Sequence, residues 1–251
     1  MLAQTRLVLH LPLAPGWLDG YVFGSTIFAY GFTHPDRQRS AAAWLAGLGG
    51  GLCFVMPFFT SGAVVSWQWA ALTPLALWLC YYGLQRPGRA GLRGVPVAKP
   101  VVVSLTWAVV TVLLPTGPER WPEVSFIFAG RTVFIFALAL AYDLSDVAYD
   151  KRHGLSTLAG RWGPRKTFRV TDAAFLVSSL CYGANAALRI FSPEDAFALV
   201  ASLIFSAWWL RFLLRKAEGS DWQKILIDAL MPLQFILVAG VEWILQVWIL
   251  K

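Results

Sequence analysis

The sequence predicts an all-α, polytopic membrane protein, folded as a single bundle of about eight transmembrane helices. Hydrophobic residues make up 57% of its 251 residues and charged residues only 14%, whereas an average soluble domain is about 45–50% apolar and about 25% charged. The chain also divides into apolar runs of about 20 residues, the length that a helix needs to cross a bilayer. Finally, its basic residues gather in alternate connecting segments. A water-soluble fold of this size could not bury so much apolar surface.

Eight candidate spans follow one another along the chain and leave no segment of useful size for a soluble domain. They are residues 17–33, 41–60, 64–84, 100–116, 123–142, 170–191, 196–214 and 225–249. Prolines occur within or at the ends of several spans, which membrane bundles tolerate. Residues 1–251 are therefore expected to form one transmembrane helical domain. Residues 1–16 are expected to be a short interfacial lead-in, or the remnant of a longer, missing first helix.

The positions of the basic residues indicate the orientation of the bundle. Sixteen of the 21 Lys and Arg residues lie in four segments, 34–40, 85–99, 143–169 and 211–224, and the opposite connections are neutral or acidic. Cytoplasmic loops of membrane proteins carry such an excess of Lys and Arg. We therefore expect an integral protein of a bacterial inner (plasma) membrane with these four segments in the cytoplasm. The net charge of +7 then indicates topology rather than a nucleic-acid partner.

One of the basic segments also carries clustered carboxylates. Asp143, Asp146 and Asp150 occupy positions i, i+3 and i+7 at the end of the fifth span, so they share one helical face within about 60°. Three such carboxylates repel one another unless a cation compensates them, and Mg²⁺ prefers one or two carboxylates plus substrate phosphates. Lys151 and Arg152 follow directly and could take the remaining phosphate charge. The pattern indicates a Mg²⁺–diphosphate site, with a solvated helix end of mixed charge as the alternative.

The same segment resembles the second aspartate-rich motif of the UbiA superfamily of intramembrane prenyltransferases. That motif reads D-x-x-x-D, followed by a basic pair, a glycine, Thr-Leu and a further glycine. Asp146 and Asp150 stand at the aspartates, and Lys151 and Arg152 at the basic pair. The remaining positions are matched by Gly154, Thr157, Leu158 and Gly163.

The resemblance implies an activity and roles for named residues. Members transfer a polyprenyl group from a prenyl diphosphate to a lipid-soluble, typically aromatic acceptor with Mg²⁺, so the implied partners are these two substrates and membrane lipid. The implied catalytic residues are Asp146 and Asp150, which with Asp143 would hold the metal. Lys151 and Arg152 would bind the diphosphate.

Arg131 is a further candidate for contact with the substrate. It lies well inside the fifth span, where a charged side chain is costly and usually faces the bundle interior. One interpretation is that Arg131 binds the diphosphate substrate. The other is that it forms a structural ion pair with Asp228 or Glu242 and holds two helices together.

The chain departs from the family in its first aspartate motif, N-x-x-x-D-x-x-x-D. The corresponding segment, residues 28–39, has neither the asparagine nor two carboxylates in register, and Asp36 stands alone. Two functions therefore remain open. The first is a UbiA-like prenyltransferase, and the alternative is a non-catalytic UbiA-like protein that binds an isoprenoid or scaffolds membrane partners. An unrelated transporter is disfavoured because no paired broken helices or internal repeats occur.

Overall fold

The structure is a computed structural model. It describes residues 1–13, 16, 18–24, 26, isolated positions between 41 and 52, and residues 72–78, 95–152, 156–215 and 221–249. Over these residues the chain is helical and contains no strand. Four of the described helical stretches are long and apolar enough to cross a membrane: Ala98–Thr116, Ser125–Ser145, Pro193–Leu213 and Trp222–Leu245. They coincide with the predicted spans 100–116, 123–142, 196–214 and 225–249.

The prediction of a helical membrane bundle is therefore confirmed for the described part of the chain. The predicted spans 17–33, 41–60 and 64–84 lie largely outside the described residues. Within the third, α4 (Leu72–Trp78) is a helix that contacts α5. The total of about eight spans stays a prediction.

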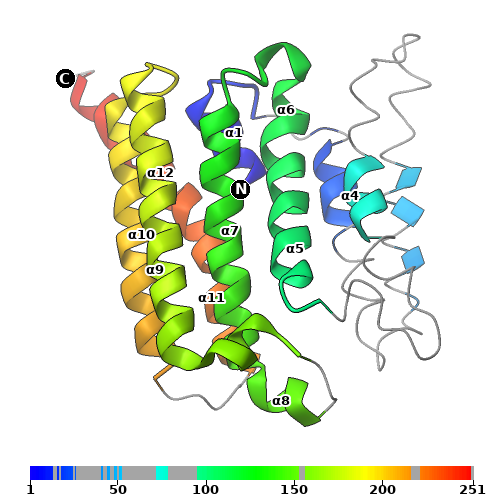
Figure 1. Ribbon diagram of the computed structural model, residues 1–251. Helices are drawn as coiled ribbons and strands as arrows, with labels where there is room; N and C mark the ends of the chain where they lie inside the picture. Colours follow the sequence, from blue (N-terminus) through cyan, green and yellow to red (C-terminus); the bar gives the residue numbers. More distant parts are fainter. Residues whose placement is uncertain are drawn as a thin grey trace.

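Helix α7 (Ser125–Ser145) lies at the centre of the bundle (Figure 1). It packs against α9 (Leu158–Ala187) on one side and α5 (Ala98–Ala108) on the other. Helix α10 (Pro193–Leu213) packs between α9 and α12 (Leu230–Ile249). The candidate site lies at one end of this central helix, so its neighbours set what surrounds the site.

Small residues bring α7 and α9 close together. A Cβ atom added to Gly130 would lie 3.1 Å from the Cβ of Cys181 and 3.1 Å from Cε1 of Tyr182. One turn earlier on α9, the Ser178 hydroxyl donates a 2.9 Å hydrogen bond to the carbonyl of Gly130. Small residues and hydroxyl hydrogen bonds are typical of helix contacts in membranes, where burial from water provides no driving force between helices.

The span that begins with α5 is irregular near its C-terminal end. A π-helical turn, Val109–Leu113, joins α5 to the short α6 (Leu114–Thr116), and a 3₁₀ turn, Pro118–Arg120, follows. The π turn lies just before Pro115, which has no N–H to donate to a regular helical ladder. Together these pieces still form a single stretch across the bundle (Figure 1).

Helix α9 consists of two helical parts that meet at a sharp turn. Gly163 has φ 73° and ψ 172°, outside the helical region, and Pro164 follows it. A positive φ is strained for residues with a Cβ, which explains a glycine here. The short first part begins at Leu158, where the Thr157 hydroxyl accepts a hydrogen bond from the amide of Gly160 at 3.3 Å. The second part corresponds to the predicted span 170–191, although it is not among the four stretches that are long and apolar enough to cross a membrane.

The segment expected to be a lead-in contains a buried helix, α1 (Leu2–Val8). It contacts α12, α6 and the π turn, and Gln4 and Thr5 are fully buried. Residues 2–8 therefore pack against these helices, and both interpretations of the segment, an interfacial lead-in and the remnant of a longer helix, stay predictions. This position brings Gln4 to Arg131 in the second turn of α7.

The described parts of three basic segments, 85–99, 143–169 and 211–224, meet at one end of the bundle, whereas the fourth, 34–40, lies outside the described residues. The start of α5, the end of α7, α8 (Val147–Arg152) and the start of α9 lie together at the lower end in Figure 1. Helix α11 (Asp221–Asp228) contacts α7 and carries Lys224 to this same end. The shared end agrees with the alternation of basic segments along the sequence.

Candidate functional site

The carboxylate of Asp143 is fully buried at the end of α7. Its Oδ1 lies 2.5 Å from Nζ of Lys99, the second residue of α5. Its other oxygen, Oδ2, is buried without a hydrogen-bond partner. A buried carboxylate needs compensating charge or donors, and Lys99 supplies these at only one oxygen.

Asp146 lies just beyond the end of α7 and has a different partner. Its Oδ1 lies 2.7 Å from Nζ of Lys224 on α11. Asp143 and Asp146 are close enough for their charges to interact. Two neighbouring carboxylates are thus compensated by two lysines that come from different helices.

The ring of Tyr142 lies close to both lysines. Its centroid is 5.8 Å from Nζ of Lys99 and 5.7 Å from Nζ of Lys224. Both distances fall within the range at which an ammonium group is attracted to an aromatic face. The ring and the two carboxylates together place two positive charges at the end of α7.

The remaining motif residues lie on the short helix α8. The amide of Asp150 donates a 2.8 Å hydrogen bond to the carbonyl of Asp146, so a helical bond crosses the break between α7 and α8. Asp150 is 7% exposed, whereas Lys151 and Arg152 are exposed. Arg152 Nε donates to the carbonyl of Ala148 at 3.3 Å. The structure therefore brings the three aspartates to one end of the bundle and leaves the basic pair at the surface.

Metal-binding side chains do not form a larger cluster there. Among the described residues, no group of three or more His, Cys, Asp or Glu side chains is placed to hold a metal ion. The carboxylate pair and the orphaned Oδ2 of Asp143 are oxygen donors of the kind that Mg²⁺ prefers. Asp36, the remnant of the first motif, lies outside the described residues.

Arg131 is fully buried in α7, about 18 Å along the helix from Asp143 at 1.5 Å per residue. Its Nη1 donates a 2.7 Å hydrogen bond to Oε1 of Gln4 and contacts Sδ of Met1. The phenol of Tyr182 lies beside the guanidinium. The predicted ion pair with Asp228 or Glu242 is wrong: neither carboxylate pairs with Arg131. Gln4 reaches Arg131 because α1 packs against the helices beside it.

The sequence pattern assigns two residues of the site, Lys99 and Lys224, only to basic connecting segments. A signal for their role does exist. Each lies in the first turn of its helix, where a positive charge opposes the helix dipole. Because this position is unfavourable for a positive charge, a lysine there suggests that a carboxylate from another helix compensates it.

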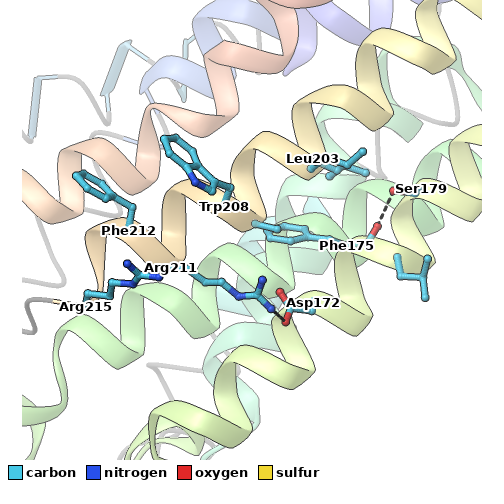
Figure 2. Close-up of a pocket in the computed structure, with 11 residues that line it drawn as sticks. Asp172, Phe175, Ser179, Leu203, Trp208, Arg211, Phe212 and Arg215 are labelled. Atoms are coloured by element: carbon cyan, nitrogen blue, oxygen red, sulfur yellow. Dashed lines mark hydrogen bonds and ion pairs between the residues drawn. The ribbon is translucent and has the colours of Figure 1, made fainter.

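A groove lies elsewhere, between α9 and α10 (Figure 2). Its volume is about 500 Å³. Asp172 of α9 forms an ion pair with Arg211 of α10 along this groove. No residue of the aspartate segment lines it.

Comparison with known proteins gives one distant match of relevance to this site. The chain is similar to a plant prenyltransferase. It is 26% identical over 186 residues to glycinol 4-dimethylallyltransferase of Glycine max, and the match covers 66% of this chain and 37% of the plant protein. No family model matches the chain, and no solved structure matches it. Together with the apolar helices, this similarity supports a membrane protein related to the broad group of prenyltransferases.

Proposed function

We propose that the protein is a UbiA-like integral membrane prenyltransferase. It would transfer a polyprenyl group from a prenyl diphosphate to a lipid-soluble, aromatic acceptor. The observation that carries the proposal is the end of α7, where Asp143 and Asp146 are compensated by Lys99 and Lys224 beside an apolar bundle. The similarity to a dimethylallyltransferase supports the same class of reaction.

The two ion pairs explain how an anionic substrate could approach this end. A prenyl diphosphate is strongly negative and would be repelled by bare aspartates. Here each of two aspartates already has a lysine partner, and the exposed Lys151 and Arg152 add two further positive charges. Charge-assisted hydrogen bonds from such groups to phosphate are short and strong.

Mg²⁺ fits the donors at this site. The ion is commonly held by one or two carboxylates together with substrate phosphates, so three converging side chains are not required. Asp146 and Asp150 would hold it, with the orphaned Oδ2 of Asp143 as a further oxygen. When bound, Mg²⁺ would neutralise charge on the leaving diphosphate.

The chain's own residues would contribute positioning and charge stabilisation. In the transfer, the bond between the prenyl carbon and the diphosphate oxygen breaks and the diphosphate leaves with the electron pair. The acceptor forms the new bond to the prenyl carbon and loses a proton, which the departing diphosphate or water takes up. Lys99, Lys224, Lys151 and Arg152 would stabilise the departing charge, and removing one such donor can cost about 10²–10³ in rate. Apolar helices would keep water from the prenyl group. In this proposal the aspartate end faces the cytoplasm of a bacterial inner membrane.

The test is a titration of the purified full chain with geranylgeranyl diphosphate, with and without Mg²⁺. We expect Mg²⁺-dependent binding that Asp146→Asn and Asp150→Asn each abolish. Glu119→Gln, which removes an exposed carboxylate at the other end of the bundle, is the matched control and should bind like the unmodified protein. Binding that ignores both the metal and the two substitutions would show that this segment is a solvated helix end.

A second measurement separates the enzyme from the non-catalytic alternative. Membranes containing the protein would be incubated with radiolabelled prenyl diphosphate and a mixture of aromatic acceptors. Transfer of the label into a lipid-soluble product supports the enzyme. Metal-dependent binding without any product from this mixture would favour a protein that only binds isoprenoids.

A further inference from the structure

The groove between α9 and α10 is apolar along most of its length. Its lining includes Phe175, Leu176, Ile204, Trp208 and Phe212, and Figure 2 shows Phe175 and Trp208 on opposite walls. Four of these side chains are also largely exposed on the outer surface of the bundle: Leu176, Ile204, Trp208 and Phe212. In a membrane-spanning bundle such a face is covered by lipid chains.

The apolar surface continues along α10. A second hollow of about 430 Å³, almost wholly apolar, adjoins the groove and shares Ile204 and Trp208 with it. Between Phe197 and Phe212 the helix rises by about 22 Å. One leaflet of the hydrocarbon core is about 15 Å thick. The surface is therefore long enough for a complete acyl chain.

The groove ends among arginines. Arg211 and Arg215 line it from α10, and Arg211 is paired with Asp172 of α9. Arg165 and Arg169 precede Asp172 by seven and three residues on α9, so they share its helical face, and both are exposed. Since α9 begins and α10 ends at the same end of the bundle (Figure 1), all four arginines lie at that end, and Arg211 and Arg215 line the groove itself.

We propose that this groove binds an anionic phospholipid. The phosphate lies among Arg165, Arg169 and Arg215, and an acyl chain follows the aromatic wall of α10. Guanidinium groups match phosphate oxygens with two parallel hydrogen bonds. Basic pockets between spans on the cytoplasmic side are suited to anionic lipid headgroups, and a tryptophan near the mouth marks the level of the interface.

A simpler role for the basic residues explains less of the arrangement. Arginines at the C-terminal end of α10 interact favourably with its helix dipole. Basic residues at one end of a span also set its orientation in the membrane. Neither effect requires Arg165 and Arg169 to stand on the one face of α9 that borders the groove. A prenyl diphosphate is a poorer occupant because no residue of the aspartate segment, which would hold its diphosphate, lines the groove.

The experiment compares two lipids on the purified full chain in neutral detergent. Native mass spectrometry would measure retention of phosphatidylglycerol and phosphatidylcholine with matched acyl chains. We expect phosphatidylglycerol to bind at least about tenfold more tightly, because each arginine near the headgroup contributes about fivefold. This comparison uses the unmodified protein, so it does not depend on whether a variant folds.

Three variants locate the site, and a fourth is their control. Arg169→Gln and Arg215→Gln should each weaken the binding of phosphatidylglycerol about fivefold and leave the binding of phosphatidylcholine unchanged. Arg189→Gln, which removes an exposed arginine at the other end of the bundle, should change neither lipid. Ala207→Trp, which fills the groove, should weaken phosphatidylglycerol binding.

Several results would overturn the proposal. Equal retention of the two lipids would show that the arginines do not select a headgroup of net negative charge here. Displacement of phosphatidylglycerol by geranylgeranyl diphosphate would assign the groove to the prenyl donor instead. Self-association that Ala207→Trp abolishes, with unchanged lipid binding, would identify the groove as a contact between two copies of the chain.

Discussion

A lysine in the first turn of a helix opposes the helix dipole, and the aspartate end of this bundle contains two of them. Lys99 opens α5 and Lys224 lies in the first turn of α11. Both are stabilised by carboxylates at the end of α7 rather than by their own helices. At the scale of single residues, the site is therefore a set of ion pairs between helices that are distant in sequence.

The pair of Lys99 and Asp143 gives the first stability prediction. Lys99→Met should lower the free energy of unfolding by about 2 kcal/mol, because it leaves a fully buried carboxylate without its cation. Removing one partner of a fully buried ion pair costs about 3–5 kcal/mol of stability. The Lys99 side chain is 38% exposed, so solvent screens part of this interaction and the expected loss is smaller. Thermal unfolding of the purified protein measures the change.

Two further variants complete this test. Lys99→Met combined with Asp143→Asn should recover most of the lost stability, because the stranded charge is gone. Lys151→Met removes an exposed lysine of α8 and should have little effect. If Lys99→Met unfolds at the same temperature as the unmodified protein, the buried pair does not stabilise the fold.

At the scale of elements, the packing of α7 on α9 positions the site. Gly130 and Ser178 set how closely the two helices approach. Because α7 carries Asp143 at its end and α9 begins directly after α8, a change in their separation would also move the aspartate segment. Membrane helices pack by such shape complementarity rather than by hydrophobic burial.

Two glycine substitutions test this packing. In Gly130→Ala the new methyl group would lie 3.1 Å from two atoms of α9, so we expect a loss of about 1–3 kcal/mol from overpacking. In Gly183→Ala no atom lies within 4 Å of the new methyl group. That variant should be neutral, or more stable by up to about 1 kcal/mol, because alanine favours the helix. Unfolding of both in the same detergent gives the comparison, and equal effects would contradict the close approach.

At the scale of the whole molecule, the bundle has two chemically different ends. One end gathers the aspartate segment with the basic residues of α8 and α9, whereas the other carries Glu119, Glu194 and Asp195. The excess of Lys and Arg predicts that the first end is cytoplasmic. Prenyl diphosphate and Mg²⁺ would then reach the site from the cytoplasm.

Cysteine labelling tests this orientation. In a variant whose three native cysteines are replaced by alanine, Ser156→Cys should react with a membrane-impermeant maleimide only after permeabilisation of the cells. Glu119→Cys, at the other end of the bundle, should react in intact cells. The reverse pattern would place the aspartate segment on the outer face and remove it from a cytoplasmic supply of substrate.

The candidate site was predictable only in part. The aspartates at 143, 146 and 150 and the basic pair are contiguous, so their pattern is visible along the chain. Lys99 and Lys224 are 44 and 78 residues away from the aspartates that they bind, and such pairings depend on which helices become neighbours. The partner of Arg131 was missed for the same reason, since Gln4 reaches it only because α1 packs against the helices beside it.

The sequence by itself determined that the chain is apolar and helical, where its described spans lie, and which connecting segments share one end of the bundle. These properties depend on composition, on run length and on local charge, which act over a few residues. Only the tertiary structure decided which lysine compensates which aspartate, how closely α7 approaches α9, and that α9 and α10 enclose an arginine-ended groove. These features are contacts between helices, and helix packing in a membrane is set by shape and hydrogen bonding rather than by apolar character that every span shares.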